Sequence, residues 1–250
     1  MGAILMPIPN HDFDPTEAGV PWRLLRMRGH RIVFATPDGR PGQADATIIT
    51  GNGLGLLGPF MKADDNGRSA YEEMAQAAGF QHPLSYDAIR SDELDALLLP
   101  GGHAPGMRPY LESTQLQSVV ADFFRAGRPV GAICHGVLVC ARSCGADGKS
   151  VLYGRKTTAL TKKVELAARV LTRLHLLNYY QTYSTTVEDE VRAVLANRDD
   201  FLGGPTGVRR DSPTKLSVGF TVRDRNYLSA RWAGDAHRFA ADFVAMLNDR

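Results

Sequence analysis

The sequence predicts an α/β fold in which helices cover both faces of a mainly parallel β-sheet. Short, almost continuously apolar segments alternate with segments of helical periodicity, and this alternation is typical of parallel sheets. The chain has 250 residues, of which 44% are hydrophobic and 22% charged, so it is long enough to bury a large core. The sequence contains no repeat or evident linker, and we expect one doubly wound domain over residues 1–250.

The first half of the chain provides most of the predicted sheet. The predicted strands are apolar runs at residues 2–8, 31–35, 94–99 and 129–133. The predicted helices between them cover residues 17–28, 71–78 and 113–126. Thr16 is placed to cap the first helix, and Gly29 is placed to end it. The Gly- and Pro-rich residues 39–59 are expected to be irregular.

The second half is predicted to add helices and the remaining strands. The predicted helices cover residues 137–143, 161–177, 187–195 and 233–248. The predicted strands cover residues 156–160, 216–223 and 227–231, the last two as a pair.

Composition and charge exclude several classes of protein. The 29 basic and 27 acidic residues leave a formal net charge of +2, which gives no electrostatic reason to expect a nucleic-acid partner. No apolar run approaches the roughly 18 residues of a membrane span, so no membrane partner is expected. The three cysteines fall within eleven positions without zinc-site spacing, which favours a reducing cytoplasm over a secreted disulfide framework. The histidines form no metal motif, and neither a metal nor another cofactor is expected.

Cys134 is the strongest candidate for chemistry. It directly follows the apolar run at residues 129–133 and precedes a predicted helix, with small residues two positions before and after it, as a tight nucleophile elbow requires. The positive end of that helix is expected to favour a thiolate and to lower the pKa of the cysteine below about 8.5. A buried structural cysteine is the alternative, and we keep that interpretation for Cys140 and Cys144.

Two other strand ends are expected at the same edge of the sheet. Gly101 and Gly102, followed by His103, end the third strand and let the backbone approach a ligand, where their amides suit an oxyanion. Glu17 begins the helix after the first strand, and a partly desolvated carboxyl there suits proton transfer. Ligands bind beyond the carboxyl ends of parallel strands, so these residues are predicted to lie near Cys134. The alternative for Gly101 and Gly102 is a plain turn. The alternative for Glu17 is a residue that only interacts favourably with the helix dipole.

Three stretches together resemble the ThiJ/PfpI superfamily of glutamine-amidotransferase-like α/β proteins. They are residues 14–17 with Pro21, Trp22 and residues 33–39; residues 99–103; and residues 131–136. Their order, spacing and type match over roughly residues 1–160, and more loosely over residues 228–241. The resemblance is nearest to the branch of glyoxalase III and chaperone-type proteins. It implies a flavodoxin-like fold, a small-molecule substrate, no cofactor and a homodimer.

The resemblance also implies roles for individual residues. Cys134 matches the nucleophile, Glu17 the acid that hydrogen-bonds the thiol, and His135 the histidine that follows the cysteine in that branch. The branch has a further acid about 30 positions after the cysteine, which orients the histidine. Glu165 stands 31 positions after Cys134 and is the matching residue. A solvated glutamate on a helix face is an equally good account of Glu165.

Trp22 and Arg231 complete the predicted substrate-binding residues. The Arg231 guanidinium would suit a carboxylate or phosphate on the substrate. The alternative for Arg231 is a surface arginine beside a core-facing Trp232. The residues after His103 depart from the Gly-rich continuation of the glyoxalase branch, which leaves the substrate open.

The predicted function is a cofactor-independent enzyme that acts on a small electrophilic carbonyl compound. In its simplest form it converts an α-oxoaldehyde such as methylglyoxal to a hydroxy acid without glutathione. Cys134 would add to the carbonyl carbon, Glu17 and His135 would move protons, and water would release the acid. Hydrolysis of an amide or isocyanide, or a dedicated biosynthetic step, is one alternative on the same site. A redox-responsive stress protein or chaperone, in which Cys134 is reversibly oxidised, is the other.

Overall fold

A seven-stranded sheet forms the centre of the computed structural model, which describes residues 1–177, 179–206 and 209–249. Its strands are β1 (Ala3–Pro7), β3 (Arg31–Thr36), β5 (Leu84–Ser85), β6 (Ala96–Leu99), β7 (Val130–Ile133), β8 (Thr221–Asp224) and β9 (Tyr227–Ala230). They lie in the order β5-β3-β1-β6-β7-β9-β8, and every neighbouring pair is parallel except β8 with β9. The predicted flavodoxin-like α/β class is therefore confirmed.

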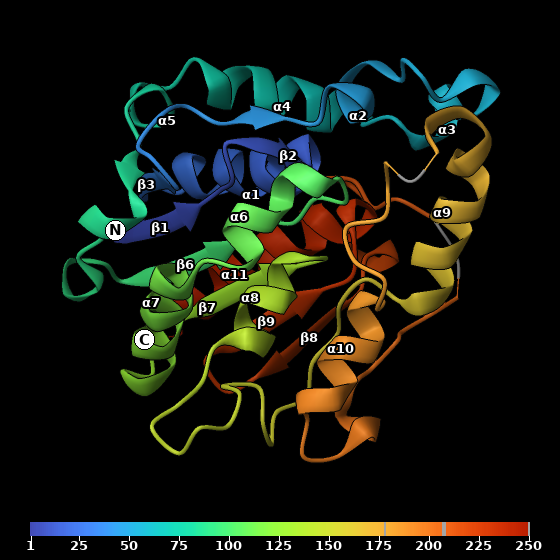
Figure 1. Cartoon of the computed structure of the whole chain (residues 1–250). Helices are drawn as coiled ribbons and strands as arrows, with labels where there is room; N and C mark the ends of the chain where they lie inside the picture. The colour runs from blue at the N-terminus through green and yellow to red at the C-terminus, as the bar shows by residue number, and fades with distance from the viewer. Residues whose placement is uncertain (178, 207–208, 250) are drawn as a thin grey trace.

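Helices cover both faces of this sheet (Figure 1). On one face α1 (Pro15–Met27) packs against α11 (Ala236–Asn248), and α4 (Asp65–Ala75) packs on the outside of α1. On the other face lie α7 (Thr114–Arg125) and α8 (Gly136–Arg142). The shorter and peripheral elements are α2 (Ala46–Thr50), α3 (Gly58–Met61), α5 (Ala78–Gln81), α6 (Arg108–Leu111), α9 (Lys162–Leu176), α10 (Val187–Val194) and a small parallel pair, β2 (His11–Phe13) with β4 (Gln43–Ala44).

The central strands are apolar on both faces because helices cover both. All residues of β6 and β7 are buried, and so are all residues of β1 after Ala3. Gly131 in β7 lets α11 approach closely, since a Cβ at this position would lie 2.9 Å from the Phe243 ring. A buried parallel strand therefore appears in the sequence as a continuous apolar run, without alternation.

The start of α1 is tied to the end of β6. Asp14, not Thr16 as predicted, is the N-cap: its side chain accepts hydrogen bonds from the amides of Thr16 and Glu17 at 2.7 and 3.1 Å. Pro15 occupies the first turn, where its missing N–H costs nothing. The Asp14 amide in turn donates to the Gly101 carbonyl at 2.8 Å. The cap thus fixes the first turn of α1, which carries Glu17, beside the end of β6.

Four predicted elements differ from the structure. Residues 156–160 do not form a strand: Thr157 makes one isolated bridge to Phe201, and the Thr158 amide donates to a side chain. Residues 216–218 form a 3₁₀ turn, residues 39–59 contain β4 and α2, and the helix predicted at 71–78 is α4. Apolar runs this short leave helix, strand and loop undecided. Within the described residues, no helix combines the length and apolar character needed to cross a membrane.

Candidate active site

Three strand ends converge at the carboxyl edge of the sheet. β1 leads into α1 and Glu17, β6 leads to Gly101, and β7 leads to Cys134. The chain continues to β3 on one side of β1 and reaches β6 on the other, so this is the switch point at which α/β sheets bind ligands. The Gly101 amide donates to Glu17 Oε2 at 3.0 Å. A Cβ on Gly101 would lie 2.6 Å from that oxygen and 2.8 Å from the Cβ of Cys134, so only glycine fits between them.

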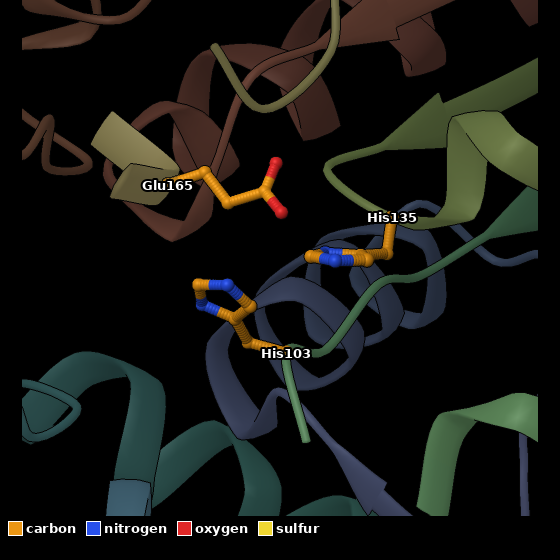
Figure 2. A group of neighbouring side chains, drawn as sticks. All are labelled: His103, His135 and Glu165. Carbon is orange, nitrogen blue, oxygen red and sulfur yellow. The ribbon is translucent and has the colours of Figure 1, made fainter. Parts of the chain in front are cut away.

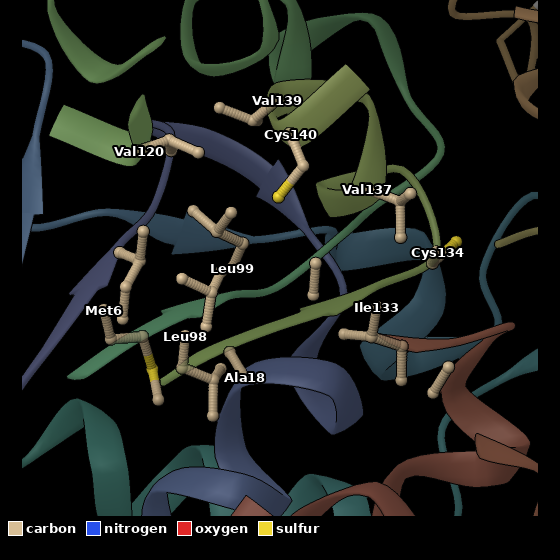
Figure 3. Close-up of a cluster of buried hydrophobic side chains, with 14 of the residues drawn as sticks. Met6, Ala18, Leu98, Leu99, Val120, Ile133, Cys134, Val137, Val139 and Cys140 are labelled. Carbon is tan, nitrogen blue, oxygen red and sulfur yellow. The ribbon is translucent and has the colours of Figure 1, made fainter. Parts of the chain in front are cut away.

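Cys134 occupies a strained backbone conformation. Its φ is +56°, in the left-handed region that side chains other than glycine rarely adopt. A hydrogen bond to the neighbouring strand fixes this turn: the Cys134 amide donates to the Ala230 carbonyl of β9 at 3.1 Å. Figure 3 shows the Cys134 sulfur pointing away from the apolar cluster, whereas the sulfur of Cys140 points into it. The positive φ therefore turns the buried Cys134 sulfur toward Glu17 and His135, while Cys140 stays a packing residue.

Glu17 and Cys134 share a buried, hydrogen-bonded environment. The two side chains are 2% and 5% exposed, and a hydrogen bond links the Glu17 carboxyl with the thiol. Burial, followed by repulsion from Asp14, raises the pKa of Glu17 well above its usual value. The raised pKa favours the protonated form of Glu17, which suits this carboxyl to exchange a proton beside the sulfur.

The predicted lowering of the cysteine pKa is not what the structure gives. Burial, followed by the neighbouring Glu17 carboxyl, raises the pKa of Cys134 well above its ordinary value. The His135 amide at the start of α8 donates to the sulfur and opposes this effect, but it is the smaller influence. In this closed arrangement Cys134 is a thiol, so its reaction as a nucleophile needs a base.

His135 supplies a base within reach of the thiol. Its Nδ1 lies 3.5 Å from Cys134 Sγ, and its Nε2 lies 3.4 Å from Thr182 Oγ1. The ring is 1% exposed, and burial, followed by the effect of His103 and Arg169, lowers the pKa of His135 well below 6.5. A neutral imidazole at neutral pH can accept the thiol proton, provided that Nδ1 carries the lone pair.

Residues 180–182 cover His103 and His135. This cover was not predicted from the sequence. Thr182 Oγ1 donates to the His103 carbonyl at 2.8 Å, and the Tyr180 ring centroid lies 5.5 Å from that of His103. Arg108 holds the segment from outside by donating to the Thr182 carbonyl at 2.6 and 3.0 Å. These contacts join residues about 75 positions apart in the chain, so no local pattern in the sequence could reveal them.

Glu165 lies close to His135 but directs its hydrogen bonds elsewhere. Its side chain is 1% exposed, so it is not a solvated surface glutamate. Oε2 accepts from the Val187 amide at 2.8 Å, and Oε1 accepts from Arg169. The group within hydrogen-bonding reach of His135 Nε2 is Thr182, not the predicted Glu165. The side chains of His103, His135 and Glu165 nevertheless gather around a common space (Figure 2).

Comparisons with known proteins identify the family. A family model described as ThiJ/PfpI family-like matches residues 8–205, which is most of the chain. The chain belongs to the ThiJ/PfpI family. Deglycase PfpI of Pyrococcus furiosus is 29% identical over 240 residues, 95% of this chain and 95% of that protein. The glutathione-independent glyoxalase hsp3101 of Schizosaccharomyces pombe is 25% identical over 167 residues, 65% of this chain and 64% of that protein.

The solved structures agree with the ThiJ/PfpI fold. Glyoxalase III from Candida albicans superposes with a TM-score of 0.71 at 17% sequence identity, covering 98% of this chain and 96% of that one. At this identity the likeness concerns the fold alone. Some other curated ThiJ/PfpI relatives match over a smaller share of their own length, 43% in one case.

Two residues assigned to the ThiJ/PfpI substrate site have other places in the structure. Arg231 is 6% exposed and is paired with Asp235, to which Nε and Nη2 donate at 2.8 and 2.9 Å. Its Nη1 donates to the Pro205 carbonyl at 2.7 Å, so its donors are directed away from a substrate anion. Trp22 is 3% exposed within the core, with the Arg26 guanidinium 5.1 Å from its ring centroid. Both side chains serve the packing of the fold.

Proposed function

We propose that this protein is a cofactor-independent enzyme that converts an α-oxoaldehyde, such as methylglyoxal, to a 2-hydroxy acid. The observation that carries the proposal is the geometry at Cys134: the His135 imidazole, whose pKa is lowered, lies 3.5 Å from the sulfur, and the Glu17 carboxyl, whose pKa is raised, is hydrogen-bonded to it. A nucleophile with a base on one side and an acid on the other suits addition to a carbonyl. The name of the Schizosaccharomyces pombe relative, a glutathione-independent glyoxalase, supports this choice.

The reaction begins with attack of the sulfur on the aldehyde carbon. His135 accepts the thiol proton as the S–C bond forms, and Glu17 donates a proton toward the new oxygen, which gives a hemithioacetal. The Gly102 amide is assigned to stabilise the developing oxyanion, and the His135 amide joins it when it turns from the sulfur, its present acceptor, to the new oxygen. The Gly101 amide is already committed to Glu17, so it is left out of this role.

The second stage moves a hydrogen between two carbons of the bound substrate. A base removes the proton from the carbon that bears sulfur, and the neighbouring carbonyl carbon is protonated through an enediol, which yields a thioester of the 2-hydroxy acid. Water then cleaves the thioester and regenerates the thiol. Overall one water is consumed and no electron acceptor is needed, which is why the reaction requires no cofactor.

A direct test is the production of lactate from methylglyoxal in the absence of glutathione and of any added metal. We expect the rate to follow the concentration of free methylglyoxal, measured by product analysis with nuclear magnetic resonance. Adding an amine lowers the free aldehyde by forming adducts, so at a fixed total concentration it should slow the reaction. A rate that rises with the amine adduct instead would contradict the isomerising reaction and favour hydrolysis.

Hydrolysis of such adducts is the second candidate. It would use the same Cys134 thiol, and the name of the relative that matches over 95% of both chains, deglycase, supports it.

The redox-responsive role has less support, because oxidation requires an accessible thiolate and Cys134 is 5% exposed with a raised pKa.

The pH dependence of kcat/KM should separate a general-base mechanism from a preformed thiolate. Because the pKa of His135 is lowered, its imidazole stays unprotonated as the pH falls past 6.5. We therefore expect kcat/KM to remain level across pH 6 to 8 (about the range of an ordinary histidine titration) and to decline only at lower pH. A half-maximal value near pH 6.5, or a steep rise up to high pH that follows the thiol, would contradict this role of His135.

A further inference from the structure

His103, His135 and Glu165 present three potential metal ligands to one another. They come from three separate segments, the loop after β6, the start of α8 and the first turn of α9, so their sequence spacing shows no motif. One nitrogen or oxygen atom of each lies within 4.8 Å of the others, and Figure 2 shows the side chains pointing into a common space. Two histidines and a glutamate are a donor set of known zinc sites, in which a water fills the fourth position.

His103 has a ring nitrogen free to coordinate, whereas His135 has to give up its contact with Thr182 or with the thiol. His103 Nε2 is buried and has no hydrogen-bond partner within the described residues, so a buried polar atom is left without compensation. His135 is 1% exposed, and desolvation disfavours its protonated form. Ligand atoms about 2.0–2.2 Å from a tetrahedral zinc ion lie roughly 3.4 Å apart, so the three atoms need to approach by on the order of 1 Å. Rotation of the side chains would have to supply that distance.

Glu165 is held in place by its own partners. The Val187 amide donates to Oε2 at 2.8 Å, and Arg169 donates to Oε1. Each carboxylate oxygen has two lone pairs, so it can keep these bonds and still face an ion, as ligating carboxylates commonly do. The Arg169 charge opposes a cation and limits its affinity. Arg169 also donates to the Tyr183 carbonyl at 2.8 Å, which gives the guanidinium a second anchor when the ion binds.

A cavity lies beside the cluster, although none of the three ligands lines it. This cavity of about 180 Å³ lies between α9 and the segment that covers the histidines, and its lining includes Arg169 and Tyr180. Arg169 is bonded to Glu165, and Tyr180 contacts His103. An ion that enters this cavity therefore reaches side chains that touch two of the three ligands.

We propose that His103, His135 and Glu165 bind a divalent transition-metal ion of the zinc class, and that the bound ion switches off Cys134. Imidazole and carboxylate donors suit Zn²⁺ better than Ca²⁺ or Mg²⁺, which prefer all-oxygen sites. If the ion binds His135 Nδ1, it takes the lone pair that faces the thiol. If it binds Nε2, the ring proton stays on Nδ1, so in either case the thiol proton has no acceptor. The inhibition rests on the proposed function, whereas the binding does not.

Metal binding is tested without reference to activity. The chain is used with Cys134→Ala and Cys144→Ser, so that neither thiol can bind the ion, and Zn²⁺ is titrated by calorimetry. We expect one ion per chain, and a Co²⁺ form whose visible spectrum lacks a thiolate charge-transfer band. His103→Ala should weaken binding by about 100-fold or more, since loss of even an outer-shell partner costs 10–100-fold. The matched control, His82→Ala, removes an exposed histidine and should leave the affinity unchanged.

The outcomes separate this proposal from the proposed function. Failure of Zn²⁺ to bind, or equal affinity in the His103→Ala chain with an unchanged circular dichroism spectrum, overturns the metal site whatever the enzyme does. In the native chain, Zn²⁺ should stop methylglyoxal turnover and a chelator should restore it. Binding without inhibition overturns the switch alone. Binding by a chain that turns over no α-oxoaldehyde leaves the site standing and contradicts the proposed reaction instead.

Discussion

Replacement of Cys134 by alanine or serine should lower turnover of methylglyoxal by at least about 10⁴-fold. The sulfur forms the covalent bond to substrate in the proposed reaction, and within the described residues the other two cysteines are elsewhere: Cys140 is buried and Cys144 lies beyond α8. Steady-state lactate production measures the effect. The unfolding temperature should shift by only a few degrees, about 2–4 °C for each kcal/mol, because the substitution removes or replaces only the sulfur atom.

Cys144→Ser is the matched control, since this cysteine is exposed and should leave turnover unchanged. Cys134→Gly adds a second comparison. Glycine relieves the strain at a φ of +56°, so this inactive chain should be about 1 kcal/mol more stable than Cys134→Ala. Residual activity above roughly 1% in the Cys134→Ala chain would show that another group performs the chemistry.

Gly136→Ala should damage both stability and activity. A Cβ at this position would lie 2.3 Å from the Leu99 carbonyl oxygen and 2.7 Å from that of Pro100. Both are backbone atoms at the end of β6, so they cannot rotate away, and α8 has to move off the strand. Overpacking of this kind costs about 3 kcal/mol or more, which corresponds to a fall of roughly 6–12 °C in the unfolding temperature. Activity should fall as well, because α8 carries His135 at its start.

Gly203→Ala is the matched control for this substitution. A Cβ on Gly203 meets no atom within 4 Å, and its backbone is not in the left-handed region. The unfolding temperature of this variant should stay within about 2 °C of the native value. A slight rise is also consistent, because alanine reduces the conformational entropy of the unfolded chain. A Gly136→Ala chain that unfolds at the native temperature would show that α8 does not pack against β6 as described.

The sequence predicted the centre of the fold well because the central strands are defined by local composition. The runs at residues 94–99 and 129–133 are apolar throughout, which a strand buried on both faces requires, and each ends at glycine or at Cys134. The segments outside the central strands were harder to predict. Residues 156–160 resemble such a run, yet their amides are satisfied by the Asp200 carbonyl and the Ser229 side chain, not by a ladder.

The roles within the site depend on contacts that sequence patterns do not carry. The family resemblance suggested Glu165 for His135, but the hydroxyl that reaches the ring belongs to Thr182, in a tyrosine-rich loop that nothing in the sequence connects with residue 135. Arg231 was assigned to a substrate anion, although Asp235 four positions later is its partner. The raised pKa of Cys134 was also missed, because a helix terminus is visible in the sequence and the extent of burial is not.

The cover over the histidines sets a limit on the size of what can react. Thr182 contacts the His103 carbonyl and the His135 ring, and Arg108 holds the Thr182 carbonyl from the other side. Cys134 is also only 5% exposed, so a side chain on an intact folded protein could reach the sulfur only after the surrounding chain had moved. A three-carbon aldehyde needs only a brief loosening. We therefore expect the site to accept small metabolites, to exclude folded macromolecules and to limit the entry of bulk water during the proposed rearrangement.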